Sequence, residues 1–209
     1  MYPISYEADF DEHQSRLRTF FRIIIAIPWL IVAAIYGIGA QIAAVIAWFA
    51  IVFSGRYPEG LYNFNVGFLR MVTRVNGFTY LLNDEWPAFT GEDDPAYPIR
   101  LEAAEPLPHY SRMKTLFRLV VGIPVMILAY VQSLILGVCH LIGWFVLLFT
   151  GKLPAGLFNP MRSASAYLAR AGAYFLLLTE DWPPFSLEEE PAIASAQLQQ
   201  ESTTTQSQA

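Results

Sequence analysis

Two long stretches of apolar residues without any charged side chain dominate the pattern along the chain. Residues 23–53 and 119–149 contain no Asp, Glu, Lys or Arg. An apolar stretch of about 18 residues or more is typical of a membrane-spanning helix. Because a straight helix over either stretch would be about 46 Å long, against about 30 Å of bilayer hydrocarbon, we interpret each stretch as two short helices in a hairpin.

The reversal of each hairpin is expected near the middle of its stretch. In the first stretch it falls at Tyr36-Gly37-Ile38-Gly39, because glycine permits tight turns. This gives helices at about 15–36 and 38–54. In the second stretch the most polar point is Tyr130-Val131-Gln132-Ser133, which gives helices at about 111–131 and 134–150. A hairpin that crosses the bilayer only in part is the alternative.

A third, amphipathic helix is predicted after each hairpin, at about 64–82 and 160–178. In the first of these, Arg70 and Arg74 share a face with small polar residues, opposite a face of Val and Leu. Such a helix fits the membrane interface with its arginines toward lipid phosphates. Before each hairpin, residues 2–7 and 97–102 alternate apolar and polar side chains, which predicts two short cytoplasmic strands.

The chain is an internal duplication. When it is shifted by 96 positions, residues 15–89 align with residues 111–185 without a gap, including their glycines and prolines. We therefore divide it into unit one (1–89), an acidic Pro-rich linker (90–110), unit two (111–185) and a disordered tail (186–209) rich in Gln, Ser and Thr.

The residues of each unit resemble a known family of bacterial membrane proteins. Each has a Tyr-Pro-Ile lead, an Arg-rich entry with Ile-Pro, a Gly-(Arg/Lys)-x-Pro-x-Gly-Leu turn, and a helix ending in an acidic pair. This pattern is similar to domain of unknown function 4389. Unit two departs from it mildly, with Lys152 in place of arginine and Leu153 in place of the aromatic residue. The resemblance implies a bacterial membrane location and no established activity.

Charge sets the expected direction of the hairpins. The chain is 55% hydrophobic and 15% charged, and its 13 Lys and Arg all lie outside the hairpins. The positive-inside rule then puts both open ends and both termini in the cytoplasm, with two spans per unit and the two copies parallel. The fold class is therefore all-α integral membrane, in the bacterial inner membrane. The acidic lead before the first stretch argues against a signal peptide, and no basic stripe indicates nucleic acid.

Candidate chemistry is sparse. Cys139 is the only cysteine, and no nucleophile, metal or phosphate motif occurs, so we expect no enzyme activity, cofactor or metal site. Arg56 and Lys152, after the hairpins, are expected to reach lipid phosphates, as are Arg70 and Arg74. The acidic pairs Asp84/Glu85 and Glu180/Asp181 are interpreted as solvated helix ends.

The sequence predicts an accessory or assembly protein that contacts anionic lipid, with other membrane proteins or itself as further partners. A small transporter or channel subunit is the alternative, because internal repeats often frame a transport path. His140 is the one titratable residue inside a hairpin and, with Gln41, Gln132 and Ser133, is a candidate polar station on such a path. A membrane enzyme is the third possibility.

Overall fold

The computed structural model describes residues 2–184 and is mostly helical. Its elements, in chain order, are β1 (Ile4–Ala8), α1 (Arg16–Ser54), α2 (Glu59–Thr79), β2 (Ile99–Ala103), α3 (Arg112–Leu116), α4 (Arg118–Val121), α5 (Ile123–Thr150) and α6 (Ala155–Phe175). The predicted disordered tail lies outside the described residues.

Unit one contains one continuous helix where a hairpin was predicted. Helix α1 runs through both glycines of the expected turn. A Cβ at Gly37 would lie 3.3 Å from the Phe68 ring, and one at Gly39 would lie 3.2 Å from the Phe64 ring. These glycines therefore let α2 approach closely and do not reverse the chain. A continuous helix also pairs its own backbone groups, which an exposed turn in lipid would leave unsatisfied.

Unit two has no hairpin either. The predicted turn lies within α5, where the Ser133 hydroxyl donates to the Tyr130 carbonyl at 2.7 Å, one turn back. The helical breaks fall earlier, at Phe117 and Gly122. A Cβ at Gly122 would lie 2.9 Å from the Phe175 ring, so this glycine also serves close packing.

Each long helix ends at a left-handed glycine, Gly55 or Gly151, with φ of 72° and 74°. This conformation favours glycine, which has no Cβ to clash. Helices α2 and α6 then begin after Pro58 and Pro154, earlier than the predicted bounds. The two predicted strands are present and pair antiparallel, with Tyr6 opposite Leu101 and Glu7 opposite Arg100.

The two copies are related by a pseudo-two-fold axis, and the predicted parallel arrangement is wrong. The Trp48 indole N–H donates to the Thr115 carbonyl at 3.0 Å, and the equivalent Trp144 donates to Thr19 at 3.0 Å. The end of α1 therefore meets α3 at the start of unit two, and the end of α5 meets the start of α1. The prediction of parallel copies depended on two membrane spans in each unit. It fails because each unit has only one long apolar helix, α1 or α5.

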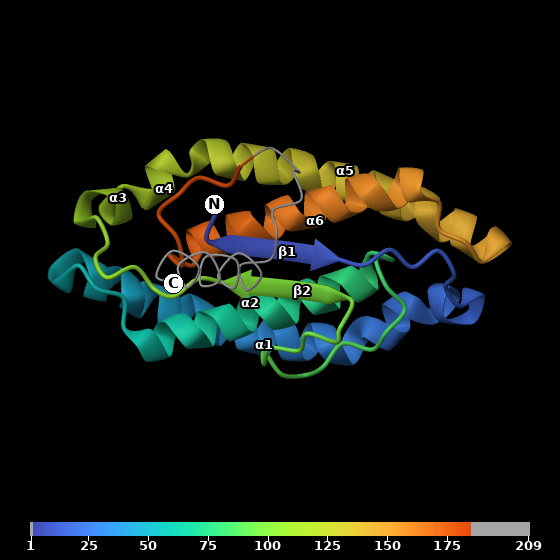
Figure 1. Cartoon of the computed structure of the whole chain (residues 1–209), viewed down its shortest axis with the longest axis horizontal. Helices are drawn as coiled ribbons and strands as arrows, with labels where there is room; N and C mark the ends of the chain where they lie inside the picture. Colours follow the sequence, from blue (N-terminus) through green and yellow to red (C-terminus); the bar gives the residue numbers. More distant parts are fainter. Residues whose placement is uncertain (1, 185–209) are drawn as a thin grey trace, which may run out of the picture.

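The elements form three layers. Figure 1 shows the helices along the long axis, with α1 and α5 on opposite edges, α2 and α6 between them, and the two strands over α2 and α6. Strand β1 packs on α6 and β2 packs on α2. The order across the molecule is strand layer, α2 and α6, then α1 and α5.

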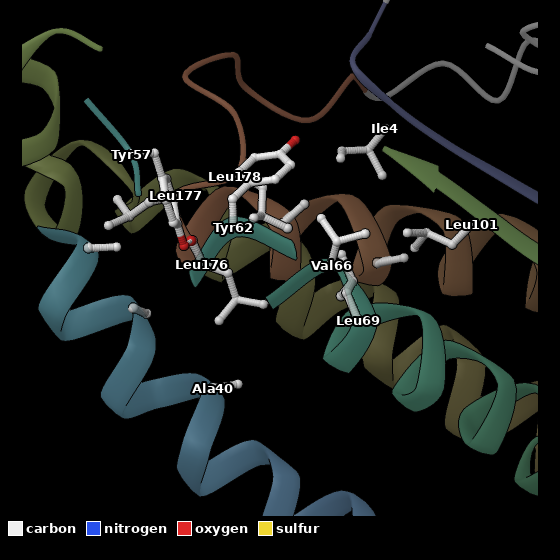
Figure 2. Close-up of a cluster of buried hydrophobic side chains, with 14 of the residues drawn as sticks. Ile4, Ala40, Tyr57, Tyr62, Val66, Leu69, Leu101, Leu176, Leu177 and Leu178 are labelled. Atoms are coloured by element: carbon white, nitrogen blue, oxygen red, sulfur yellow. Dashed lines mark hydrogen bonds between the residues drawn. The ribbon is translucent and has the colours of Figure 1, made fainter. Parts of the chain in front are cut away.

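One core is shared by both units. Figure 2 shows Val66 and Leu69 of α2 beside Leu176, between Ala40 of α1 on one side and Ile4 of β1 on the other. The Tyr57 hydroxyl donates to the Leu176 carbonyl at 3.1 Å and accepts from the Asn65 amide at 2.8 Å, and burial raises its pKa to about 12. Residues of unit one thus pack directly on the helix end of unit two.

Candidate membrane-binding surface

The outward face of α1 is almost entirely apolar from Ile23 to Phe53. Its inward stripe is made of small side chains, which allow close helix packing. That stripe comprises Ala26, Ala33, Ala40, Ala44 and Ala47. The large apolar residues face outward instead, among them Ile23, Ile24, Ile27, Ile31, Ile35, Ile38, Ile42, Val45, Phe49 and Phe53. Helix α1 therefore has the reverse of the pattern expected for a core helix.

Helix α5 repeats this arrangement. Its exposed large residues include Ile123, Met126, Ile127, Leu134, Val138, Leu141, Ile142, Phe145 and Phe149. Both α1 and α5 are long and apolar enough to cross a membrane, yet only 17% and 11% of the most apolar stretch of each is buried. A core helix of a water-soluble protein would bury most of such a stretch. The apolar surface of these two helices is the candidate site.

A buried arginine holds the start of α1 against the end of α2. Arg22 is 1% exposed and donates to the carbonyls of Phe78 at 2.6 Å and Asn83 at 2.8 Å. It also donates to Asp84 Oδ1 at 2.7 Å. The last carbonyls of a helix have no partner within the helix and carry partial negative charge, so a guanidinium there is favourable.

Unit two has the same contact. Arg118 donates to the carbonyls of Tyr174 and Thr179, at the end of α6. Glu180 accepts from the Ser111 backbone N–H and pairs with Lys114 at 3.6 Å. The acidic pairs were interpreted as solvated helix ends, but their first members bind other segments: Asp84 binds the start of α1, and Glu180 binds the start of α3. We call each arginine and its carbonyl partners an arginine clasp.

The strand layer is polar on its outer side. Arg100 of β2 donates to Glu7 Oε2 at 3.1 Å and to Asp9 Oδ2 at 2.8 Å. The hydrogen bond to Asp9 raises the pKa of Arg100, and the same bond lowers the pKa of the Asp9 carboxyl. Beneath this layer, burial raises the pKa of Tyr97 to about 12. The strand layer thus carries fixed charges on the side of the molecule away from the apolar surface.

Among the predicted lipid-contacting residues, two are exposed at the surface. Arg56 and Lys152 follow the two long helices, and Lys152 Nζ lies 3.1 Å from Glu12 Oε1. Contact of either residue with lipid phosphate stays a prediction.

The other two lie under the strand layer. Arg70 donates to the Leu101 carbonyl at 3.1 Å, and Arg74 is 2% exposed with its guanidinium 5.5 Å from the centre of the Tyr97 ring. In this arrangement Arg74 has no exposed surface for a headgroup, because the polar face of α2 is covered by β2.

The structure does not bring the remaining candidate residues into one site. The His140 ring contacts the Tyr80 ring, with centroids 5.4 Å apart, and Cys139 is a half-buried free thiol. Within residues 2–184, no group of three or more His, Cys, Asp or Glu side chains could hold a metal ion.

The arginine clasps were not predicted, although the sequence carried a signal for them. Arg22 and Arg118 recur at equivalent positions, and each is followed at the same spacing by an acid.

The family comparison agrees with this duplicated architecture. A family described as a domain of unknown function, DUF4389, matches the chain twice, at residues 16–91 and 112–186. The chain belongs to the DUF4389 family. Each DUF4389 match includes one long apolar helix (α1 or α5), the helix that follows it (α2 or α6) and one arginine clasp. The chain matches no curated protein and no solved structure.

Proposed function

We propose that this protein is a non-enzymatic membrane protein that lies along the plane of the bilayer. Helices α1 and α5 are embedded in the hydrocarbon of one leaflet, and the strand layer faces water. The single observation that carries the proposal is the one-sided distribution of apolar surface, with α1 and α5 exposed on one side and the charged strands on the other.

The length of α1 favours this orientation. Its 39 residues make a rod about 58 Å long, nearly twice the thickness of the hydrocarbon core, about 30 Å. Its charge-free part, residues 23–53, is still about 46 Å long. An apolar surface of that length is better covered when the helix lies in the membrane plane.

The basic residues also favour it. Because the copies are antiparallel, Arg16 and Lys152 lie at one end of the long axis, where the Arg16 side chain is near Gly151. Arg56 and Arg112 lie at the other end, where Arg112 is near Gly55. A spanning orientation would place these clusters on opposite sides of the membrane, against the positive-inside rule. An in-plane orientation places all of them at the same depth.

The strand layer gives a third argument. The strands run beside α2 and α6, midway along the long axis (Figure 1). If the helices stood upright in the bilayer, the ion pairs of Arg100 with Glu7 and Asp9 would lie near the centre of the hydrocarbon. Charges at that depth cost at least about 2.5–3.5 kcal/mol each on insertion scales. In the flat orientation they face water.

An accessory or assembly role fits this arrangement. The apolar surface is occupied by lipid, and the strand layer remains available on the aqueous side for another membrane protein or a second copy of the chain. The absence of known catalytic motifs in the sequence supports a non-catalytic role.

Cysteine labelling in intact cells tests the orientation. In a Cys139→Ser background, single cysteines replace Glu12 and Glu59, which are exposed residues at opposite ends of α1. We expect both cysteines to behave alike toward a membrane-impermeant thiol reagent, because both ends lie on the same side of the membrane.

Labelling after the cells are permeabilised is the control and should modify both positions. Reaction of one end and protection of the other in intact cells would mean that α1 crosses the bilayer, and the in-plane proposal would be wrong.

A further inference from the structure

A cavity of about 320 Å³ lies at the centre of the molecule, between α2 and α6. Its size is at the lower end of the range for small-molecule sites. Residues of all three layers line it, among them Tyr6 of β1, Gln41 of α1, Val72 of α2, Leu136 of α5, and Ser165 and Leu168 of α6. It therefore extends from the level of α1 and α5 to the underside of β1.

The cavity opens on the apolar side of the molecule. Gln41 of α1 lines it and is exposed, as is Asn76 of α2. The position on α5 equivalent to Gln41 is Gly137. A Cβ at Gly137 would meet no atom within 4 Å, so the space beside this glycine is open. In the proposed orientation these amides face hydrocarbon, where an unpaired polar group is costly. A polar ligand group at the mouth would supply their hydrogen bonds.

The inner end of the cavity is polar and buried. Ser165 is 8% exposed, and its hydroxyl interacts with the buried Tyr6 hydroxyl, at a geometry that gives neither oxygen a well-formed hydrogen bond. Burial raises the pKa of Tyr6, and the nearby Ser165 hydroxyl opposes that shift. Tyr6 is therefore a neutral phenol that can donate. Buried polar groups usually make well-formed hydrogen bonds, so this loosely paired set of hydroxyls beside a cavity can take a further hydrogen bond from a ligand oxygen.

A comparison of the two units shows that most of the polar lining of the cavity belongs to unit one. Most polar lining residues come from unit one, and their equivalents in unit two are small or apolar. The pairs are Tyr6 and Leu101, Gln41 and Gly137, Thr73 and Ala169, Asn76 and Gly172, and Tyr80 and Leu176. Ser165 is the exception, with Leu69 as its equivalent. The cavity thus has one polar wall and one apolar wall.

The chemistry of these walls defines the ligand. None of the lining residues is an Asp, Glu, Lys, Arg or His. The site can hydrogen-bond hydroxyl or carbonyl groups but cannot neutralise a charge. Its mouth faces lipid, so a hydrocarbon chain can remain outside between α1 and α5.

We propose that the cavity binds an uncharged amphiphile from the bilayer, of the diacylglycerol type. The hydroxyl of the head lies at Tyr6 and Ser165, an ester carbonyl lies at Gln41 by the mouth, and the acyl chains leave between α1 and α5. This inference rests on the proposed membrane orientation.

Photolabelling tests it with a diacylglycerol that carries a diazirine near its glycerol. The full chain is reconstituted in phosphatidylcholine vesicles, and the labelled residues are mapped by mass spectrometry. We expect labelling of Val72 on α2 and Leu168 on α6, which line the cavity. Unlabelled diacylglycerol should compete, and phosphatidylglycerol, which has a charged head, should not. Equal competition by phosphatidylglycerol would overturn the uncharged class.

Two substitutions give the decisive comparison. Ser165→Leu removes a hydroxyl from the inner end, and Gln41→Leu removes the amide from the exposed mouth without touching the core. Each should reduce labelling of the cavity roughly fivefold, as expected for one lost hydrogen bond. Ser163→Leu, on the same helix but outside the lining, should leave it unchanged.

The outcome also separates this proposal from the one on which it rests. If labelling falls only on outward residues such as Ile42, or if neither Ser165→Leu nor Gln41→Leu changes it, the cavity is not the site and the membrane orientation stands. If neither the cavity residues nor any residue of α1 or α5 is labelled, the membrane orientation itself fails.

Discussion

At the scale of single residues, each arginine clasp places a buried charge beside an apolar helix and pairs it with helix-end carbonyls. Arg22 and Arg118 lie at the entry of apolar helices, where a charge is expensive, and both are almost fully buried. Both guanidinium groups donate to carbonyls at the ends of α2 and α6. Each clasp therefore fixes the angle between a long apolar helix and the inner helix that follows it.

Replacing Arg22 by leucine should destabilise the protein by roughly 3–5 kcal/mol, because Asp84 and two helix-end carbonyls lose a buried partner. Arg18→Leu is the matched control. Arg18 also pairs with Asp84, at 3.4 Å, but its side chain is 44% exposed. The cost there should stay below about 1 kcal/mol. Thermal unfolding followed by circular dichroism in one detergent compares the two. Equal losses would show that the carbonyl contacts contribute little.

At the scale of elements, α2 is held between α1 and the strands, and a glycine of α2 allows the close approach of β2. Gly77 lies directly under β2, and a Cβ there would overlap Ile99 Cδ1. Gly60, in the first turn of the same helix, has no atom within 4 Å of such a Cβ. One helix therefore contains a glycine required by packing and another that packing does not require.

Gly77→Ala should lower stability by about 1–3 kcal/mol, since Ile99 must move and β2 with it. Gly60→Ala should be neutral or stabilising by up to about 1 kcal/mol, because alanine has the higher helix propensity. Both variants make the same chemical change in α2, so the difference between their unfolding midpoints isolates the contact with β2. A stabilised Gly77→Ala variant would contradict this packing argument.

The elements also show what could and could not be predicted from the sequence. The repeat, the two strands and the existence of an inner helix in each unit follow from patterns within a few residues. The hairpins were wrong because Gly37 and Gly39 serve contacts with Phe68 and Phe64, which lie far along the chain. A local pattern cannot distinguish a glycine needed for a turn from one needed for close packing. The burial of Arg74 was missed for a similar reason, because β2 covers it.

At the scale of the whole molecule, the pseudo-two-fold axis runs through the strand pair, from the charged strand side to the apolar side. In the proposed orientation this axis is the membrane normal, and the two exposed bases Arg56 and Lys152 lie at equivalent places on opposite ends. Each should therefore make the same contribution to contact with an anionic headgroup.

Arg56→Gln and Lys152→Gln should each weaken the interaction with phosphatidylglycerol by roughly 1 kcal/mol, and the double variant by about the sum. The measurement is the rise in unfolding temperature when phosphatidylglycerol, rather than phosphatidylcholine, is added to the detergent-solubilised protein. Arg100→Gln is the control, because Arg100 lies on the strand side and should not change the preference for anionic lipid. A loss confined to one of the two ends would contradict the flat orientation.

The crossed contacts of Trp48 and Trp144 have a consequence for the origin of the chain. The tryptophan of each unit donates a hydrogen bond to a carbonyl of the other unit. A single unit would therefore leave that indole and half of the shared core uncovered. An ancestor with one copy would have existed as a symmetric homodimer. A homodimer must place the same residue on both sides of its axis. Fusion into one chain removed that constraint, which is how a cavity on the axis can have tyrosine, glutamine and asparagine on one wall and leucine and glycine on the other.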